Sequence, residues 1–223
     1  MLKIENVDIV GWETAIRGMR NPMNSWAKSD TFFFCPSQGD IRKIGEGPNL
    51  ELMSEIGPND AGLMMKLRNC GTDHRKFMRM ITVYMDITAP LYWWKEYDTY
   101  KVGTVANSCS TMHKISAKEF TLDDFSHEHL QEDSIAVLES VIHTMNVHRE
   151  WFNEKALDDP KIDWWQMIQL LPSSYNQRRT VMLNYEVLAN MYKSRKNHKL
   201  DEWRTFCEYV KTFPYSELII GGE

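Results

Sequence analysis

The sequence lacks the cysteine patterns of disulfide-bonded and zinc-binding proteins. Its four cysteines are scattered, and no CxxC pair occurs among Cys35, Cys70, Cys109 and Cys207. This spacing argues against a disulfide framework and a thiolate zinc site, and it fits a reducing, cytoplasmic compartment. Because free cysteines in such proteins are mostly buried and unreactive, we expect the same of these.

A long hydrophobic run and a surplus of basic residues are also missing. No stretch of about 18 apolar residues occurs, and the amino-terminal residues lack the apolar core of a signal peptide. The formal net charge is -5, whereas proteins that bind nucleic acid usually carry a basic surplus or stripe. We therefore expect neither a membrane span nor a nucleic-acid partner.

The composition is that of an ordinary globular protein. The chain has 223 residues, of which 43% are hydrophobic and 26% charged. This length and composition predict a single domain over residues 1–223 with a sizeable core. The Gly- and Pro-rich segment at about 31–48 is typical of a loop or hairpin elaboration.

The first half of the chain predicts a helix, a strand and a second helix. Asn59 and Asp60 follow a proline and predict the cap of a helix that ends near Asn69. Apolar residues then alternate from Phe77 to Ile87, which indicates a strand with one buried face. Arg79 interrupts that apolar set, so we expect this end of the strand near an edge or a site. Ala89-Pro90 opens the next helix, with the proline in its first turn.

The second half is predicted to be helical. Apolar residues at helical spacing indicate a long amphipathic helix over 134–153. Further helices are expected over about 175–194, after Leu171-Pro172, and over 201–212. The predicted fold class is therefore α/β (α+β), a small sheet flanked by helices.

The densest polar and aromatic stretch runs from Trp93 to Lys114, WWKEYDTYKVGTVANSCSTMHK. Its hydroxyl and amide side chains, with exposed backbone N–H groups, are suited to gripping a phosphate or a base edge. Composition alone favours the plainer alternative, a polar connection beside a solvated helix face.

Two histidine-containing segments allow a functional and a plain interpretation. His74 lies between a predicted helix and a predicted strand, where α/β proteins commonly place ligand contacts, although a lone histidine is more often a surface or capping residue. The run from Asp123 to His129 contains possible metal ligands. Its spacing matches no specific metal motif, so a polar turn is favoured and no metal site is predicted.

A group of amide and guanidinium side chains follows Pro172: Arg178, Arg179, Asn184, Asn190 and Arg195. If the segment is helical, Asn184 and Arg195, eleven positions apart, lie near one face, and Asn190 lies about 60° away. An Asn and an Arg that point the same way can read a uracil-like edge or hold a cofactor. A solvated helix face is the alternative.

The closing run LLPSSYNQRRTVMLNYEVLANMYKSRKNHKLDEWRTFCEYV resembles the closing segment of the flavin-dependent thymidylate synthases. In that family, a Leu-Pro is followed by a helix carrying two Asn and an Arg, and then by a helix that begins with Trp. The matching positions here are Pro172, Asn184, Asn190, Arg195 and Trp203.

The central run resembles the same family. His74 lies at the matching distance before Ala89-Pro90, and the family's Arg-His-Arg signature falls on Thr99-Tyr100-Lys101. In addition, residues 15–20 look like the family's early Arg-rich helix. The resemblance covers about Glu13 to Phe213, in pieces.

This resemblance implies a fold, an assembly and a reaction. The fold is a mixed sheet with flanking helices, assembled as a homotetramer that binds FAD and dUMP at subunit interfaces. The reaction is reductive methylation at C5 of dUMP or a related pyrimidine deoxynucleotide, with methylenetetrahydrofolate as carbon donor and NADPH as reductant. The cofactor carries the difficult chemistry, so no protein nucleophile is required.

Carried over residue by residue, the resemblance assigns three groups of side chains. The flavin-binding group comprises His74, Tyr100, Lys101, Asn184 and Asn190. The nucleotide-binding group comprises Asn107, Cys109, Ser110 and Arg195, and the catalytic pair is Asn184 and Arg195. Arg178 is added to the nucleotide-binding group as a replacement for a family arginine that this chain lacks, with Lys114 and His113 as alternatives.

The chain departs from the family at the signature, where Arg-His-Arg has become Thr-Tyr-Lys, and at Thr111, where the family has an arginine near the phosphate. Two alternatives to the enzyme are therefore kept. One is a divergent nucleotide-binding or nucleotide-modifying relative. The other is a non-catalytic interaction protein on the same scaffold.

Overall fold

The computed structural model describes residues 1–32 and 55–221, so most of the elaboration expected at 31–48 lies outside the described residues. The chain divides into two compact units. Unit 1 comprises residues 1–3, 87–99 and 107–179, and unit 2 comprises residues 4–86, 100–106 and 180–223. Each strand of the sheet described below has residues in both units, and the single domain expected over 1–223 stays a prediction.

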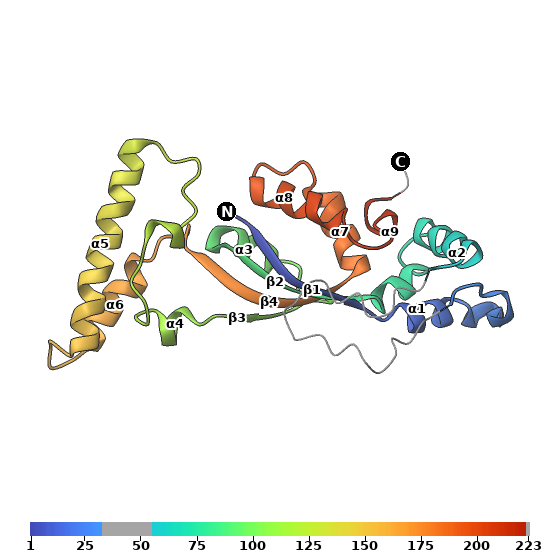
Figure 1. Ribbon diagram of the computed structural model, residues 1–223, viewed down its shortest axis with the longest axis horizontal. Coiled ribbons are helices and arrows are strands. Elements are labelled where there is room, and N and C mark those ends of the chain that lie inside the picture. Colours follow the sequence, from blue (N-terminus) through green and yellow to red (C-terminus); the bar gives the residue numbers. More distant parts are fainter. Residues whose placement is uncertain (33–54, 222–223) are drawn as a thin grey trace. The chain divides into compact units, whose positions relative to one another are not determined.

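Four strands of the described residues form one sheet (Figure 1). Its strands are β1 (Lys3–Val10), β2 (Thr82–Pro90), β3 (Val105–Ser108) and β4 (Asn176–Asn184), in the order β1-β2-β4-β3. In β2, Val83 and Met85 are buried and Tyr84 between them is exposed. Side chains of a strand alternate between the two faces of a sheet, so β2 has one face in the core. The predicted α/β class is confirmed.

The strand expected from Phe77 is shorter than its sequence pattern suggested. The first part is a 3-10 helix, η3 (Arg75–Arg79), and β2 begins only at Thr82. Phe77 and Met78 are both buried, which neighbouring residues on a half-buried strand cannot be. At its other end β2 runs directly into α3 (Leu91–Tyr97), and Pro90 is the N-cap of that helix rather than a first-turn residue.

The helix expected over 175–194 is wrong for its first half. Residues up to Asn184 form β4, and α7 (Tyr185–Arg195) follows. Gln177, Val181 and Leu183 are buried at the two-residue period of a strand. The Asn184 side chain accepts a hydrogen bond from the Val187 backbone at 3.0 Å, and this N-cap starts the helix there.

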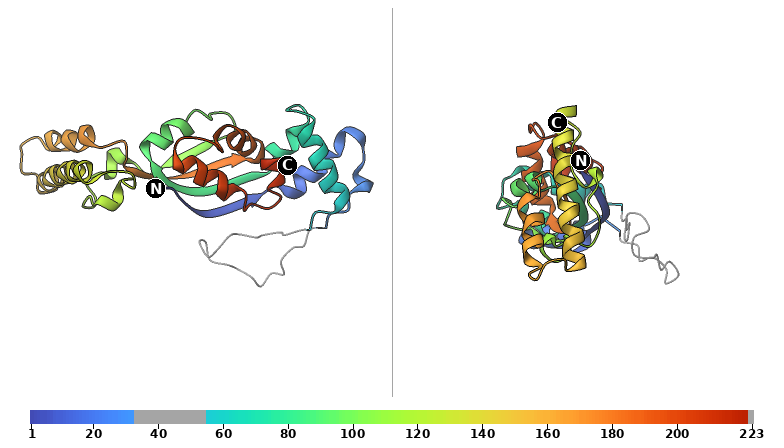
Figure 2. Two further views of the ribbon diagram at one scale, coloured as in Figure 1. Left: turned by 90° about the horizontal axis from the view of Figure 1, so that it is seen from above. Right: turned by 90° about the vertical axis from the view of Figure 1, so that its left-hand side faces the viewer.

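Unit 1 contains two helices that lie side by side (Figures 1 and 2). The long helix expected over 134–153 is confirmed as α5 (Glu132–Glu154), and α6 (Lys161–Leu170), which the sequence analysis did not predict, packs on it. Met145 and Met167 belong to their shared core. The short elements α4 (Thr111–Lys114) and η4 (Leu122–Asp124) belong to the same unit.

Unit 2 contains helices from both ends of the chain. Its elements from the amino-terminal half are α1 (Trp12–Met19), η1 (Asn21–Met23), η2 (Trp26–Lys28), α2 (Pro58–Asn69) and η3. From the carboxyl-terminal part come α7, α8 (Asp201–Val210) and α9 (Glu217–Ile220). The final helix expected over 201–212 is thus confirmed with a slightly earlier end. Helix α7 packs against α8 and α9, with Trp203 and Phe206 fully buried.

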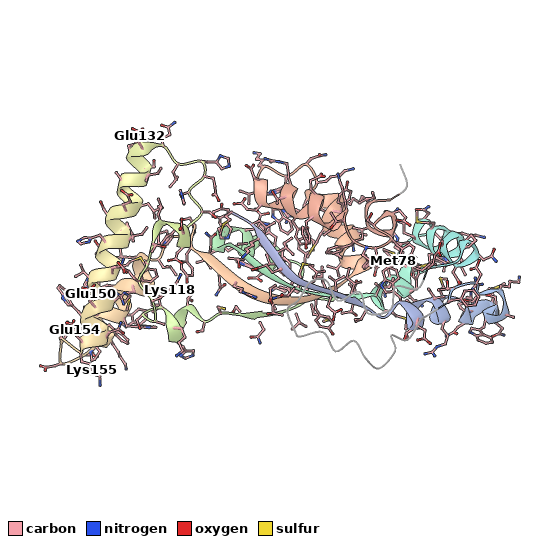
Figure 3. All side chains as sticks on the ribbon, in the orientation of Figure 1. Met78, Lys118, Glu132, Glu150, Glu154 and Lys155 are labelled. Carbon is pink, nitrogen blue, oxygen red and sulfur yellow. The ribbon has the colours of Figure 1, made fainter. Side chains whose placement is uncertain are left out.

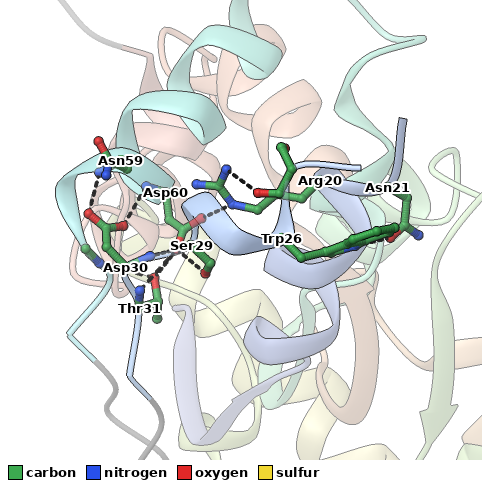
Figure 4. Close-up of polar contacts among 10 residues, drawn as sticks. Arg20, Asn21, Trp26, Ser29, Asp30, Thr31, Asn59 and Asp60 are labelled. Atoms are coloured by element: carbon green, nitrogen blue, oxygen red, sulfur yellow. Dashed lines mark hydrogen bonds and ion pairs between the residues drawn. The ribbon is translucent and has the colours of Figure 1, made fainter. Parts of the chain in front are cut away.

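A buried carboxylate ties the amino-terminal segment to α2 (Figure 4). Asp60, with no exposed surface, accepts hydrogen bonds from Arg20, Ser29, Asp30 and Thr31. The expected capping role of Asn59 and Asp60 is wrong. Their own backbone N–H groups donate to the Asp30 carboxylate, at 2.9 and 3.1 Å, so Asp30 satisfies the first turn of α2.

Among the described residues, no helix has the length and apolar character needed to cross a membrane.

Candidate functional site

The best-defined group of predicted site residues surrounds helix α7 in unit 2. At its carboxyl-terminal end, Arg195 Nε donates a hydrogen bond to the Tyr100 hydroxyl at 3.0 Å. The Arg195 guanidinium lies 4.9 Å from the centre of the Trp203 ring and 5.6 Å from that of Tyr100. Cation–π contact on two sides and a hydrogen bond at Nε hold the guanidinium in one orientation.

Trp203 supplies the rigid side of this arrangement. Its ring is fully buried and packs edge-on against Phe206, with the ring centres 5.8 Å apart. Tyr100 meets the same indole at 6.1 Å, also edge-on. The packing of the Trp203 ring in the core fixes its position. The ring is therefore a rigid surface against which the Arg195 guanidinium is held.

At the other end of α7, the loop after Tyr100 returns to Asn184. Gly103 adopts a left-handed backbone, with φ of +78°, and a Cβ placed there would lie 3.0 Å from Asn184 Nδ2 and 3.1 Å from Val187 Cγ2. Only glycine allows this approach without displacing the amide. The Thr104 hydroxyl closes the loop by donating to the Tyr100 carbonyl. Segment 100–104 therefore lies along α7 from Arg195 to Asn184.

An ion pair fixes η3 beside the start of α7. Arg79 Nε donates to the Glu186 carboxylate, and Arg79 Nη2 donates to the Thr72 carbonyl at 3.2 Å. The interruption that Arg79 makes in the apolar pattern thus marks a contact with the site helix. Glu186 is almost fully buried, and its Oε1 has no hydrogen-bond partner among the described residues. His74 is the residue that precedes η3, and it is exposed.

Two further predicted flavin-binding residues, Lys101 and Asn190, are exposed. Lys101 follows Tyr100 in the loop along α7, and Asn190 lies on the solvent side of α7 itself. The expectation that Asn184 and Arg195 share one face of a helix is wrong, since Asn184 is the N-cap at the end of β4. The structure brings Tyr100, Asn184 and Arg195 to the two ends of one short helix instead.

The remaining predicted nucleotide-binding residues belong to unit 1. The Cys109 backbone N–H donates to the Arg178 carbonyl at 2.9 Å, and Gln177 Nε2 donates to the Cys109 carbonyl at 2.8 Å. These bonds place Cys109 beside β4. Ser110 caps the short helix α4 by accepting from the His113 backbone. Asn107, Cys109, Ser110 and Arg178 are all exposed, so this edge presents an amide, a thiol, a hydroxyl and a guanidinium to solvent.

Arg179, next to Arg178, has a structural role. Its guanidinium carbon lies 4.3 Å from the centre of the buried Trp94 ring. Its Nη1 donates to Asp98 at 2.8 Å, and its Nε donates to the Gln177 side chain at 3.0 Å. Neighbouring residues of a strand point to opposite faces, so Arg178 faces away from this cluster.

The run from Asp123 to His129 forms a capped turn. Asp124 accepts a hydrogen bond from the Thr121 backbone at 2.9 Å, and His127 Nδ1 lies 2.8 Å from the Phe125 carbonyl. Within residues 1–32 and 55–221, no group of three or more His, Cys, Asp or Glu side chains is arranged to hold a metal ion.

The thiols are less uniform than expected. Cys207 is buried, and burial raises its pKa to about 11, whereas Cys70 and Cys109 are exposed. The expected burial is therefore wrong for these two, their low reactivity stays a prediction, and Cys35 lies outside the described residues.

Sequence analysis missed Gly103 and Glu186 as site residues. Gly103 follows the signature position by two residues. A glycine there signals a turn, but the sequence does not indicate which residue that turn contacts. Glu186 looked like an ordinary first-turn carboxylate, which stabilises a helix start wherever it occurs. Its burial under Arg79 depends on the packing of η3.

Comparisons with known proteins agree with this geometry at the level of the fold. No model of a known protein family matches the sequence, and no curated protein matches it. Two matching solved structures are of the flavin-dependent thymidylate synthase ThyX from Helicobacter pylori, each with FAD and dUMP. Both have a TM-score of 0.65 and 14% sequence identity. The matches cover 98% and 99% of this chain and 98% of each ThyX chain. The chain is thus similar in fold to ThyX over almost its whole length.

Proposed function

We propose that this chain is a FAD-dependent thymidylate synthase-like enzyme that methylates C5 of dUMP or a related pyrimidine nucleotide. The observation that carries the proposal is the arrangement around α7, where Tyr100, Asn184 and Arg195 occupy the two ends of one helix. The family resemblance, made on these residues, assigns them to the flavin and the base. The fold similarity to ThyX over nearly the full length supports the same interpretation.

Arg195 is suited to reading a pyrimidine. A guanidinium presents a flat set of N–H donors, which matches the carbonyl edge of a uracil ring. Tyr100 and Trp203 hold that plane before any ligand binds. A ligand therefore does not bear the entropy cost of ordering a long, flexible side chain, about 2 kcal/mol for an arginine.

The side chains assigned to FAD fit that cofactor in chemical type. His74, Lys101 and Asn190 are exposed and offer an imidazole, an ammonium and an amide, which are donors that phosphates and flavin carbonyls accept. When bound, FAD would supply the hydride chemistry that no amino-acid side chain provides. NADPH and methylenetetrahydrofolate are proposed as the co-substrates.

The edge formed by Asn107, Cys109, Ser110 and Arg178 is proposed to bind the nucleotide phosphate. Arg178, which is exposed at this edge, is proposed to supply the positive charge that attracts the phosphate. In this proposal, the charge replaces that of the family's arginine, whose position is occupied here by Thr111. The proposed assembly is a homotetramer with its sites between subunits, in the cytoplasm.

One observation favours a second candidate function, a divergent protein that binds or modifies a pyrimidine nucleotide without flavin. The signature positions Thr99-Tyr100-Lys101 keep one cation where the family has two arginines and a histidine. Tyr100 is moreover engaged with Arg195. In this alternative, the tyrosine serves the base-binding arginine rather than a cofactor.

The ultraviolet-visible spectrum of the purified protein, before and after addition of FAD, separates the two candidates. The first predicts a flavin absorption band that stays with the protein on gel filtration. Protein that retains no FAD at tens of micromolar, yet melts at a higher temperature with dUMP or dCMP, supports the second. If neither FAD nor any pyrimidine nucleotide binds, both candidates fail and a non-catalytic interaction protein is left.

Matched variants on α7 connect the binding to the site. Arg195→Gln removes the guanidinium and should abolish the dUMP-induced rise in melting temperature. Lys193→Gln, at an exposed position two residues earlier, removes the same charge and should leave that rise intact. Equal loss in both variants would point to non-specific electrostatics. Complementation of a thymidine-requiring strain then tests whether binding leads to catalysis.

A further inference from the structure

Helix α5 of unit 1 has three distinct faces. Leu138, Ile142 and Met145 form the face that packs into the core. Glu139, Glu150 and Glu154 lie on a second, acidic flank, because separations of eleven and four residues are close to whole numbers of helical turns. Figure 3 labels Glu150 and Glu154 on this helix, with Glu132 at its beginning and Lys155 at its end.

The third face has a different composition. It is the series Asp133, Val137, Ser140, Thr144, His148, Trp151 and Lys155, which we call the α5 stripe. Successive members are three or four residues apart, so they lie one above another along the helix. Val137 is 65% exposed and Trp151 is 45% exposed. Between Asp133 and Lys155 the stripe carries no Asp, Glu, Lys or Arg, although α5 has several elsewhere.

The polar groups of the stripe can be covered without losing hydrogen bonds. Ser140 and Thr144 donate their hydroxyl hydrogens back to the helix, to the carbonyls of Ala136 and Ser140, each at 2.9 Å. His148 Nδ1 is already paired with Asp163 of α6 at 2.9 Å. A partner that excludes water from this surface therefore leaves few hydrogen-bond donors without an acceptor. The free-energy cost of burying polar side chains is correspondingly small.

The order of residues in the stripe indicates which partner fits. Each member has a counterpart equally far on the other side of Thr144: Asp133 with Lys155, Val137 with Trp151, and Ser140 with His148. An antiparallel second copy of the helix therefore pairs Asp133 with Lys155 at both ends of the contact. Closer to its centre, it places Val137 against Trp151. A surface that matches itself under a two-fold rotation is the requirement for a symmetric dimer contact.

Lys155 has an unusual backbone for a lysine. It ends α5 in the left-handed conformation, with φ of +52°. Glycine or asparagine is the usual residue at such a helix end, because a Cβ there costs about 1 kcal/mol. The lysine thus holds its position against a local conformational preference, and in the antiparallel arrangement it is the residue that meets Asp133.

We propose that a second copy of this chain docks antiparallel on the α5 stripe, with the two-fold axis passing beside Thr144. Three interactions stabilise the proposed contact: opposite charges at both ends, apolar contacts between Val137 and Trp151, and the antiparallel alignment of the two helix dipoles. The proposal concerns the assembly part of the proposed function and requires neither flavin nor nucleotide. Its outcome is independent of ligand binding, because the absorption spectrum measures FAD binding and the melting temperature measures dUMP binding.

A reciprocal charge exchange tests the pairing. Sedimentation velocity over a range of concentrations compares the wild-type protein with Asp133→Lys, Lys155→Asp and the double variant. Each single change puts like charges together at both ends of the contact and should weaken association by roughly tenfold or more. The double variant should return to within about threefold of wild type, since opposite charges face each other again.

The double variant also separates docking from helix stability. Each single change opposes the α5 dipole, and the double variant keeps both unfavourable charges. Recovered association therefore cannot come from a recovered helix. Glu139→Lys, on the acidic flank, is the matched control and should leave association unchanged. Single changes no stronger than this control, or a double variant that stays weak, would overturn the proposal, as would a wild-type protein that stays monomeric at 100 micromolar.

Two further variants test the contact without relying on charge repulsion. Lys155→Gly relieves the left-handed backbone, so its melting temperature should equal or exceed that of wild type while its association weakens. Thr144→Cys should cross-link to its symmetry mate with a short bis-maleimide far better than Glu139→Cys, which has the same number of thiols. Equal cross-linking of the two cysteine variants would rule out an axis at Thr144.

Discussion

Tyr100 and Arg195 are joined by a hydrogen bond of 3.0 Å, from the guanidinium Nε to the phenol oxygen, across 95 positions of sequence. The contact links the position of the family's signature to the arginine that is proposed to bind the base, two features that the sequence analysis treated separately. In this chain, the tyrosine positions a charge instead of supplying one.

Tyr100→Phe should weaken nucleotide binding while leaving the fold intact. The change keeps the ring that flanks the guanidinium and removes only the acceptor of the Nε hydrogen bond. Because hydrogen bonds to charged groups contribute about 1.5–3 kcal/mol, the Kd for dUMP should rise roughly tenfold or more. Calorimetric titration measures it. The control is Tyr84→Phe on β2, an exposed tyrosine, and equal effects of the two changes would contradict the positioning role.

Gly103→Ala should disturb the amide of Asn184. A methyl group at this position would lie 3.0 Å from Asn184 Nδ2 on a backbone with φ of +78°. We expect a loss of about 1–2 kcal/mol in the free energy of unfolding, and weaker ligand binding. Gly62→Ala in α2 is the matched control, since nothing lies within 4 Å of its added methyl, and there the same change should stabilise by about 0.5–1 kcal/mol. Denaturant titration measures both. If Gly103→Ala left the free energy of unfolding unchanged, segment 100–104 would not be held against α7.

Asp60→Asn should be among the most destabilising single changes in unit 2. Asp60 is fully buried and accepts five hydrogen bonds, one from the Arg20 guanidinium. The amide cannot accept all five, and Arg20, itself buried, loses its counter-charge. We expect a loss of about 3 kcal/mol or more, measured by urea unfolding. Asp123→Asn, at an exposed position, should change stability by less than about 0.5 kcal/mol.

The same carboxylate makes stability depend on acid. Burial alone raises the pKa of Asp60, but the hydrogen bonds from Thr31, Ser29 and Arg20, with the charge of Arg20, outweigh it and hold the pKa below its ordinary value. The folded pKa is therefore below the unfolded one. The stabilisation from Asp60 is fully present above about pH 4, the unfolded value, and is lost as pH falls through the folded pKa. The unfolding free energy of Asp60→Asn should be flatter than that of wild type below pH 4, and parallel curves would exclude Asp60 as the titrating group.

Arg79→Met should destabilise the contact between η3 and α7. It leaves the nearly buried Glu186 carboxylate without its cation, and one oxygen of that carboxylate already lacks a hydrogen-bond partner within the part of the chain that the structure describes. A loss of about 1–3 kcal/mol is expected, because a buried acceptor loses its charged donor while Arg79 itself is half exposed. Lys76→Met, an exposed cation in the same 3-10 helix, is the control. Adding Glu186→Gln to Arg79→Met should recover part of the loss, and no recovery would mean that the ion pair is not the cause.

Hydrophobic periodicity determined part of the structure by itself. The long helix α5 and the helix α8 follow from apolar residues at helical spacing, and the buried face of β2 follows from its alternation. These patterns are local, because each is set by the geometry of one element against one core. The resemblance in the sequence likewise placed Asn184, Arg195 and Trp203 in a common motif.

Tertiary structure decided what local patterns leave open. Residues 176–184 have a sequence that suits a helix or a strand, and the place of β4 in the sheet, with Asn184 capping α7, selects the strand. The start of β2 at Thr82, the burial of Glu186 beneath Arg79 and the close approach of Gly103 to Asn184 all involve partners far away in sequence. Backbone propensities amount to a few tenths of a kcal/mol per residue, whereas burial contributes more than 1 kcal/mol per side chain, so packing overrides the local preference wherever the two differ.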